Sequence, residues 1–125
     1  LEVFKRVIHD ILKLSTKCFV DKDLDVAKQV EPLEEVVDNM NLEIKQRHIK
    51  RLRKGECTIE LGFILADITT NFERIADHCS NIAVCLLEVS ADEFDMHAYL
   101  NELKKDDNID FRSKVVAYEQ RYQLP

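Results

Sequence analysis

The fold is decided by residues 58–89, which read TIELGFILADITTNFERIADHCSNIAVCLLEV. Apolar side chains recur along this stretch at alternating steps of four and three residues: Leu61, Leu65, Ile68, Phe72, Ile75, Cys79, Ile82 and Leu86. Such a rhythm, kept for about four heptads, is typical of a long helix that packs against other long helices. Thr58 is the expected N-cap of this helix.

Two more helices are expected before this stretch, over residues 2–19 and 24–54. The first has an apolar stripe at Phe4, Val7, Ile11, Leu14 and Cys18, and the second at Val26, Val30, Leu33, Val37, Met40 and Ile44. Asp21 or Asp23 is expected to cap the second helix. Gly55 can adopt the left-handed conformation that ends a helix.

These patterns predict an all-α fold, an antiparallel three-helix bundle over residues 1–90. With only two glycines and two prolines among 125 residues, the chain has few breaks between helices. Residues 91–125 are expected to form a helical tail, with one or two short helices, packed on the same domain. Ser90 and Glu93 form a capping-box pattern, and Asp110 is the expected cap of a final helix.

The composition excludes several functions and compartments. A formal net charge of −6 argues against nucleic acid as a partner. The longest uncharged stretch, residues 79–87, is far shorter than the ~20 residues that cross a bilayer. Four cysteines without a CxxC spacing favour reduced thiols. The chain opens on Leu1, so we expect it to be part of a larger protein.

Two acidic motifs of equal spacing are the candidate functional residues. Glu34 and Asp38 are separated by three residues, and so are Glu73 and Asp77, so each pair lies on one helix face. The midpoints of the two pairs, residues 36 and 75, are equally far from the turn at Gly55. In an antiparallel hairpin, both pairs reach the same height, roughly 29 Å from the turn. Four carboxylates are therefore expected to meet.

Such a cluster needs something to offset its repulsion. Two unit charges ~4 Å apart cost about 4 kcal/mol at an effective dielectric of ~20. Bound cations, raised pKa values, or the basic neighbours Lys45 and Arg74 could supply the offset. Carboxylates alone favour hard cations such as Mg²⁺, Ca²⁺, Mn²⁺ or iron, with zinc also feasible. The alternative is a solvated acidic face without a ligand. Small residues beside the second pair favour close helix approach: Thr69, Ala76 and Ser80.

The histidines give no support for an enzyme. Di-metal oxidases in helical bundles use Glu-x-x-His pairs, and none of the four histidines has Glu three residues before it. We therefore expect no catalytic residues and assign structural or surface roles to His9, His48, His78 and His97.

Residues 72–83, FERIADHCSNIA, closely resemble the helix signature of the PhoU family, in which an E-R-I-x-D-H-x-x-N-I-A string is typical. Residues 34–52 resemble the preceding helix of the same repeat. This resemblance implies a three-helix repeat whose acidic motifs bind a multinuclear cluster, usually of iron or zinc. The implied metal ligands are Glu34, Asp38, Glu73 and Asp77. It also implies regulation of phosphate uptake and phosphate-responsive signalling.

A full member of that family has two such repeats, whereas this chain has one repeat and a tail. The tail around residues 97–104 resembles the cytoplasmic C-terminal domain of bacterial Na⁺/phosphate cotransporter-type proteins. The resemblance implies a transporter membrane domain as partner, at the cytoplasmic side of the plasma membrane. A homodimer could also cover the long apolar stripe. The alternative function is a helical protein-interaction module without metal.

Overall fold

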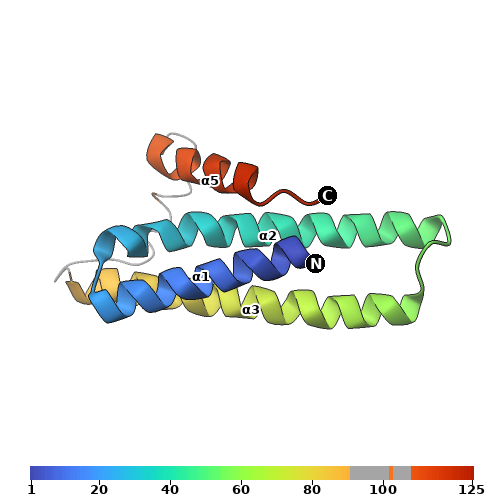
Figure 1. Ribbon diagram of the computed structural model, residues 1–125, viewed down its shortest axis with the longest axis horizontal. Coiled ribbons are helices and arrows are strands. Elements are labelled where there is room, and N and C mark those ends of the chain that lie inside the picture. The colour runs from blue at the N-terminus through green and yellow to red at the C-terminus, as the bar shows by residue number, and fades with distance from the viewer. Residues whose placement is uncertain (91–101, 103–107) are drawn as a thin grey trace.

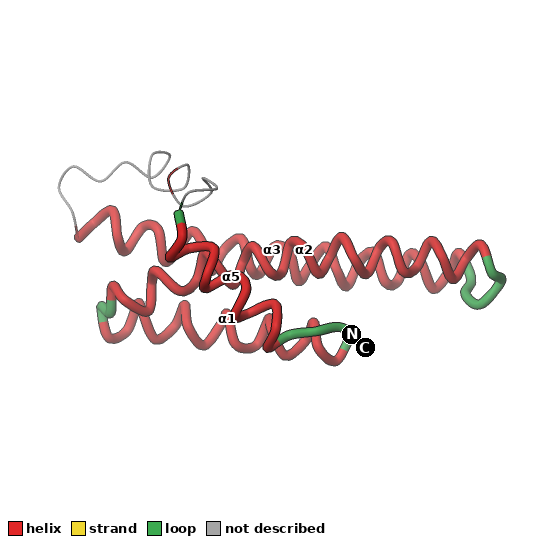
Figure 2. Tube along the Cα trace, turned by 90° about the horizontal axis from the view of Figure 1, so that it is seen from above, coloured by secondary structure: helices red, strands yellow, loops and turns green. Residues whose placement is uncertain are grey.

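The computed structural model describes residues 1–90, 102 and 108–125, and these residues contain four helices and no strand. The helices are α1 (Glu2–Asp21), α2 (Leu24–Arg53), α3 (Ile59–Ser90) and α5 (Ile109–Arg121). α2 runs antiparallel to both α1 and α3, and the three pack as a bundle with α5 lying along α2 (Figures 1 and 2). The prediction of an all-α bundle is confirmed. The helix expected between residues 90 and 103 falls almost entirely outside the described residues.

The ends of the helices follow the capping residues. Lys22 adopts a left-handed conformation after α1, with φ of 51°. The structure then selects Asp23 over Asp21 as the cap of α2, because its carboxylate accepts the amide protons of Asp25 and Val26. Gly55, with φ of 72°, lies in the turn after α2 as predicted.

The start of α3 is also as predicted. The Thr58 hydroxyl accepts a hydrogen bond of 3.2 Å from the amide of Leu61. This bond satisfies one of the amide groups that have no partner within the first turn of a helix.

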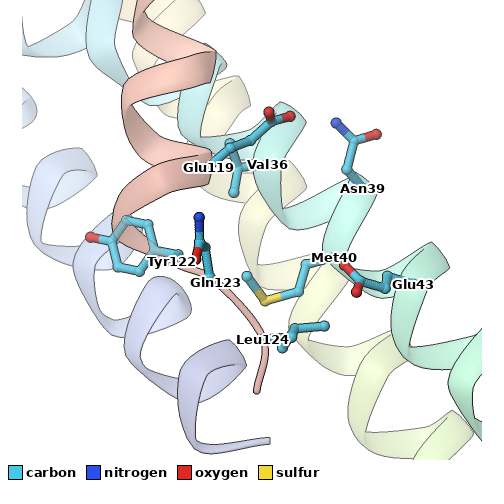
Figure 3. Close-up of a pocket in the computed structure, with 8 residues that line it drawn as sticks. All are labelled: Val36, Asn39, Met40, Glu43, Glu119, Tyr122, Gln123 and Leu124. Carbon is cyan, nitrogen blue, oxygen red and sulfur yellow. The ribbon is translucent and has the colours of Figure 1, made fainter.

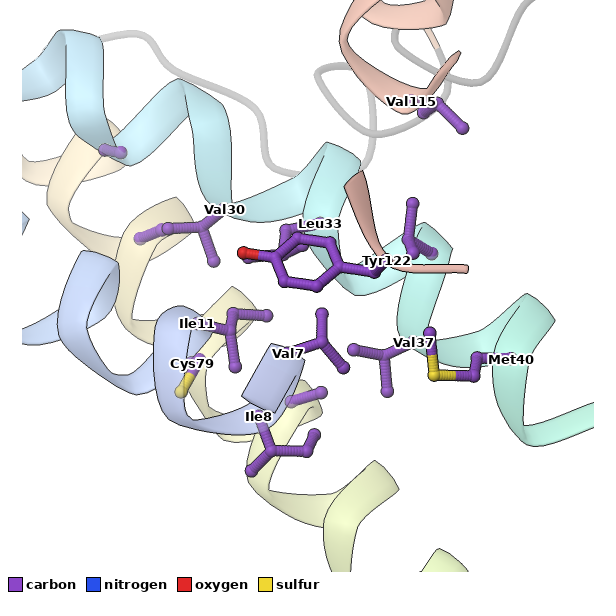
Figure 4. Packing of buried hydrophobic residues seen from close by; sticks show 14 of the residues in the cluster. Val7, Ile8, Ile11, Val30, Leu33, Val37, Met40, Cys79, Val115 and Tyr122 are labelled. Atoms are coloured by element: carbon purple, nitrogen blue, oxygen red, sulfur yellow. The ribbon is translucent and has the colours of Figure 1, made fainter. Parts of the chain in front are cut away.

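The core lies between α1, α2 and α3 and extends to α5 (Figure 4). From α1, Phe4, Val7 and Ile11 are fully buried, and the ring of Phe4 meets Phe72 edge to face at 5.3 Å. Complete burial of a side chain of this size contributes about 1.5–3 kcal/mol. Cys18 and Cys79 are buried as small apolar residues, which the stripe pattern predicted.

The apolar stripe of α3 is less buried than the sequence suggested. Leu61 is 54% exposed and Ile82 is 42% exposed, whereas the deeply buried residues of α3 are small ones such as Thr69 and Ala76. Length explains the exposure of Leu61: α1 has 20 residues and α3 has 32, so α1 leaves the N-terminal part of α3 uncovered (Figure 1).

Near the C-terminal end of α3, the same stripe faces an open groove of about 1090 Å³. It is lined by apolar residues of α1 and α3 that include Phe19, Ile82 and Val89. Despite this apolar surface, no helix in the described part of the chain is both long and apolar enough to span a membrane.

α5 packs on the bundle through buried residues in its first half and just beyond its end. Asn108, and not the expected Asp110, caps this helix, since its side chain accepts the amide proton of Phe111 at 3.0 Å. Phe111 and Tyr122 are buried in the common core.

A cleft of about 350 Å³ remains between α2 and the chain end, lined by Met40 and Tyr122 among others (Figure 3).

Candidate metal centre

A row of polar side chains crosses the otherwise apolar contact between α2 and α3. On α2 it comprises Glu31, Glu34, Asp38 and Asn41, and on α3 it comprises Glu73, Asp77 and Ser80. Steps of three and four keep each set on one helix face. We call these seven residues the polar seam. It lies on the side of α2 that faces α3, and none of its members lines the cleft of Figure 3.

Three carboxylates meet in the middle of the seam. Glu34, Asp38 and Asp77 each offer an oxygen, and these oxygens lie within 4.8 Å of one another. Glu34 is 6% exposed, Asp38 is half-buried and Asp77 is exposed, so the group opens to solvent on the Asp77 side. Carboxylate oxygens gathered this closely, with one open side, are a donor set that suits a hard cation.

The crowding of these carboxylates affects the pKa of Asp38. Burial is the largest cause that raises the pKa of Asp38 above its ordinary value of 3.8. A hydrogen bond with Glu34 opposes the rise, whereas the charges of Glu73, Asp77 and Glu35 add to it. A bound cation would offset this crowding of negative charge.

Glu73, the fourth carboxylate expected from the sequence, lies beside this group and not within it. Its Oε2 accepts a hydrogen bond of 2.7 Å from Nδ2 of Asn41. Its charge still acts on Asp38, so the two parts of the seam are electrostatically connected. The equal distance of both motifs from the turn predicted four carboxylates together. The structure gathers three of them, because an amide donor one turn further along α2 engages the fourth.

The other end of the seam is closed by a second hydrogen bond. The hydroxyl of Ser80 donates to Glu31, which is only 4% exposed. Neither Glu31 nor Asn41 was singled out from the sequence, and Ser80 was noted only for its small size. Spacing could have found Asn41 and Ser80, because each lies seven residues after the first acid of a motif.

Small residues let the two helices approach closely around the seam. Thr69 and Ala76 are completely buried, and the hydroxyl of Thr69 bonds to the carbonyl of Ala66 in its own helix. Lys45 and Arg74, the basic neighbours considered above, are exposed.

Among the histidines, His48 differs most from its expected surface role. It is half-buried near the start of α3, and its Nδ1 lies 3.5 Å from the sulfur of Cys57. It lies more than two turns of α2 away from Asp38, so it is not part of the seam.

Comparison with known proteins places the helical bundle in a family. Residues 1–86, which include the whole polar seam, match the PhoU domain. The chain is 32% identical over 77 residues to the Phosphate-specific transport system accessory protein PhoU homolog 1 of Thermotoga maritima. That alignment covers 62% of this chain and 32% of the relative, so the chain spans about a third of the relative's length. No solved structure matches. On the strength of the match over residues 1–86, the chain belongs to the PhoU domain family.

Proposed function

We propose that this domain binds a metal cluster at the polar seam and regulates phosphate transport or phosphate-responsive signalling. The observation that carries the proposal is the group formed by Glu34, Asp38 and Asp77, whose oxygens lie within 4.8 Å of one another. Glu73 lies next to this group and would complete the ligand set. The family resemblance favours iron or zinc, and an all-carboxylate set also suits Mg²⁺, Ca²⁺ or Mn²⁺.

The metal would act as a structural and regulatory element and not as a catalyst. When bound, it would supply positive charge to a group of closely spaced carboxylates. Glu34 and Asp38 come from α2 and Asp77 from α3, so these residues hold both helices to one ligand. Anything that binds only the folded state stabilises it. Metal occupancy would therefore stiffen the middle of the α2–α3 hairpin.

The regulatory role is supported by family membership and by the relative's name, which describes an accessory protein of a phosphate-specific transport system. We propose that the partner is the membrane domain of a phosphate transporter, of the Na⁺/phosphate cotransporter type. The place of action would be the cytoplasmic face of the plasma membrane. A second copy of the chain is a further candidate partner, and nucleic acid is not proposed because of the negative net charge.

Metal analysis of the purified chain tests the binding step. Iron and zinc content would be measured as isolated and after addition of each metal, in the natural chain and in the Asp38→Asn/Asp77→Asn variant. The Asp67→Asn/Glu88→Gln variant is the matched control, because it removes two exposed charges from α3 outside the seam. We expect metal in the natural chain and the control, and a loss of metal in the seam variant. No metal in any of the three would refute the ligand assignment.

Phosphate uptake in cells tests the regulatory step. The seam variant and its control would be placed in the full-length protein, and uptake would be followed during phosphate excess. We expect uptake to remain high in the seam variant and to be restrained in the control. If the seam variant restrains uptake normally and is as stable as the natural chain, the domain is an interaction module that needs no metal.

A further inference from the structure

Asn41 carries an unused oxygen at one end of the polar seam. Its side chain is only 3% exposed, and its Oδ1 has no hydrogen-bond partner within the part of the chain that the structure describes. Buried amide oxygens are nearly always paired, so an unpaired one calls for a ligand or an ordered water. We infer that Asn41 Oδ1 is a neutral oxygen ligand of the cation proposed for the seam. This inference rests on the proposed function.

The orientation of the amide follows from its contact with Glu73. Nδ2 of Asn41 donates to the Glu73 carboxylate at 2.7 Å. An ionised carboxylate only accepts hydrogen bonds, so the opposite orientation would set the amide oxygen against another oxygen. Oδ1 shares its planar amide with the nitrogen that contacts Glu73, and the whole side chain is enclosed at the contact between α2 and α3. Because Oδ1 is bonded to the same carbon as this nitrogen, the unpaired oxygen lies close to the Glu73 end of the seam.

The position of Asn41 also fits a ligand. It lies three residues after Asp38 and seven after Glu34, so it continues the row of oxygens by one helical turn. Glu73, which it contacts, acts electrostatically on Asp38. A cation at this end of the seam would be held by Glu73 and the Asn41 carbonyl, next to the group formed by Glu34, Asp38 and Asp77. The same amide would hold Glu73 in place through its nitrogen.

This ligand narrows the class of cation. Neutral amide carbonyls are common ligands of hard cations that take six or more oxygens, such as Ca²⁺ and Mn²⁺. Zinc prefers four ligands with nitrogen or sulfur among them. With Asn41 included, the donor set consists of oxygens alone. We therefore expect Mn²⁺ to be bound in a way that depends on Asn41.

The test measures Mn²⁺ binding to the whole chain by calorimetry, together with the thermal midpoint of the metal-free protein. Asn41→Leu removes both polar atoms at similar volume. Asn41→Asp keeps an oxygen at Oδ1 and removes the amide donor. Asn39→Leu makes the same chemical change at an exposed position of α2.

We expect Asn41→Leu to weaken Mn²⁺ binding by at least about tenfold. Its metal-free midpoint should change little, because the loss of the hydrogen bond to Glu73 is offset by the removal of an unpaired buried oxygen. Asn39→Leu should bind as the natural chain does. Asn41→Asp should bind at least as tightly as the natural chain, because the oxygen ligand remains and gains charge.

Several results would overturn the inference. Equal affinity in Asn41→Leu and Asn39→Leu would show that Oδ1 meets only water. Weak binding in Asn41→Asp would show that Asn41 acts only by holding Glu73 through its nitrogen. A lower metal-free midpoint in Asn41→Leu, without recovery of binding in Asn41→Asp, would indicate a packing role. If the natural chain binds none of Mn²⁺, iron and zinc, the proposed function itself is wrong. If the natural chain binds metal and Asn41→Leu binds it equally well, only the role of Asn41 is wrong.

Discussion

The hydroxyl of Tyr122 donates a hydrogen bond to the carboxylate of Asp10, which joins the end of the last helix to the middle of the first. The two residues are 112 positions apart in the chain. The guanidinium of Arg6 lies 5.5 Å above the centre of the Tyr122 ring, and its terminal nitrogen bonds to the carbonyl of Arg121. Burial of the Tyr122 ring in the core completes this attachment of α5.

Loss of this hydroxyl should weaken the attachment of α5. We expect Tyr122→Phe to lower the free energy of unfolding by about 1–3 kcal/mol at pH 8, because Asp10 loses a donor. Denaturant unfolding measures the change. Asp10→Asn is the control, since its amide oxygen still accepts the bond, and it should cost less. Equal costs would mean that the charge of Asp10, and not the bond itself, matters.

The same tyrosine should make the protein sensitive to alkali. Burial first, and then the bond with Asp10, raise the pKa of Tyr122 well above its ordinary value of 10.0. Its stabilising contribution is therefore complete below pH 10 and declines as the pH rises further, because the unfolded chain ionises first. The stability difference between the natural chain and Tyr122→Phe should shrink between pH 8 and pH 11. A constant difference would contradict this.

Asp38 should make the metal-free protein more stable in mild acid. Its pKa in the folded state lies above the ordinary value of 3.8, chiefly because of burial. Between these two pKa values the folded state binds more protons than the unfolded one, so stability falls as the pH rises. The contribution is complete below pH 3.8 and is lost as the pH rises through the folded-state pKa.

Asp38→Asn should remove this dependence. We expect the variant to be more stable than the metal-free natural chain at pH 7, by roughly 1 kcal/mol or about 4 °C in Tm. The difference should narrow as the pH is lowered, which thermal unfolding in the presence of a chelator would show. With metal bound the order should reverse, since the variant lacks a ligand. A variant that is less stable at pH 7 without metal would contradict the repulsion argument.

The hydroxyl of Ser80 should stabilise the folded protein, because it pairs with the buried carboxylate of Glu31. The serine hydroxyl donates to this buried carboxylate across the contact between α2 and α3. We expect Ser80→Ala to lower the free energy of unfolding by about 1–3 kcal/mol. The same change in a Glu31→Gln background should cost less, because the side chain no longer carries charge. Ser113→Ala, at an exposed position of α5, should have little effect.

His48 occupies the space beside Gly62 and should reduce the benefit of a larger residue there. A methyl group at Gly62 would lie 2.5 Å from Nε2 of the histidine, so the ring, whose Nδ1 contacts Cys57, would have to shift. Glycine to alanine within a helix gains up to about 1 kcal/mol. We expect that gain for Gly62→Ala in a His48→Ala background and a smaller one in the natural chain. Denaturant unfolding of the four proteins gives the difference, and equal gains would refute this contact.

The short-range features of this protein were predictable from its sequence. Helices α1 to α3, the role of Thr58 and the left-handed Gly55 depend on spacing and capping, which are local properties of the chain. Placing the two acidic motifs at one height needed only their equal distance from the turn.

The tertiary structure decided which side chains meet. Three of the four predicted carboxylates form one group, and the fourth, Glu73, accepts a hydrogen bond from Asn41. This division depends on which side chains of the facing helices lie within hydrogen-bonding distance. The tertiary structure also enclosed Glu31 beside Ser80 and attached α5 through Tyr122 and Asp10. Periodicity fixes the face of a helix that a residue occupies, whereas contacts between distant residues depend on how the helices are packed.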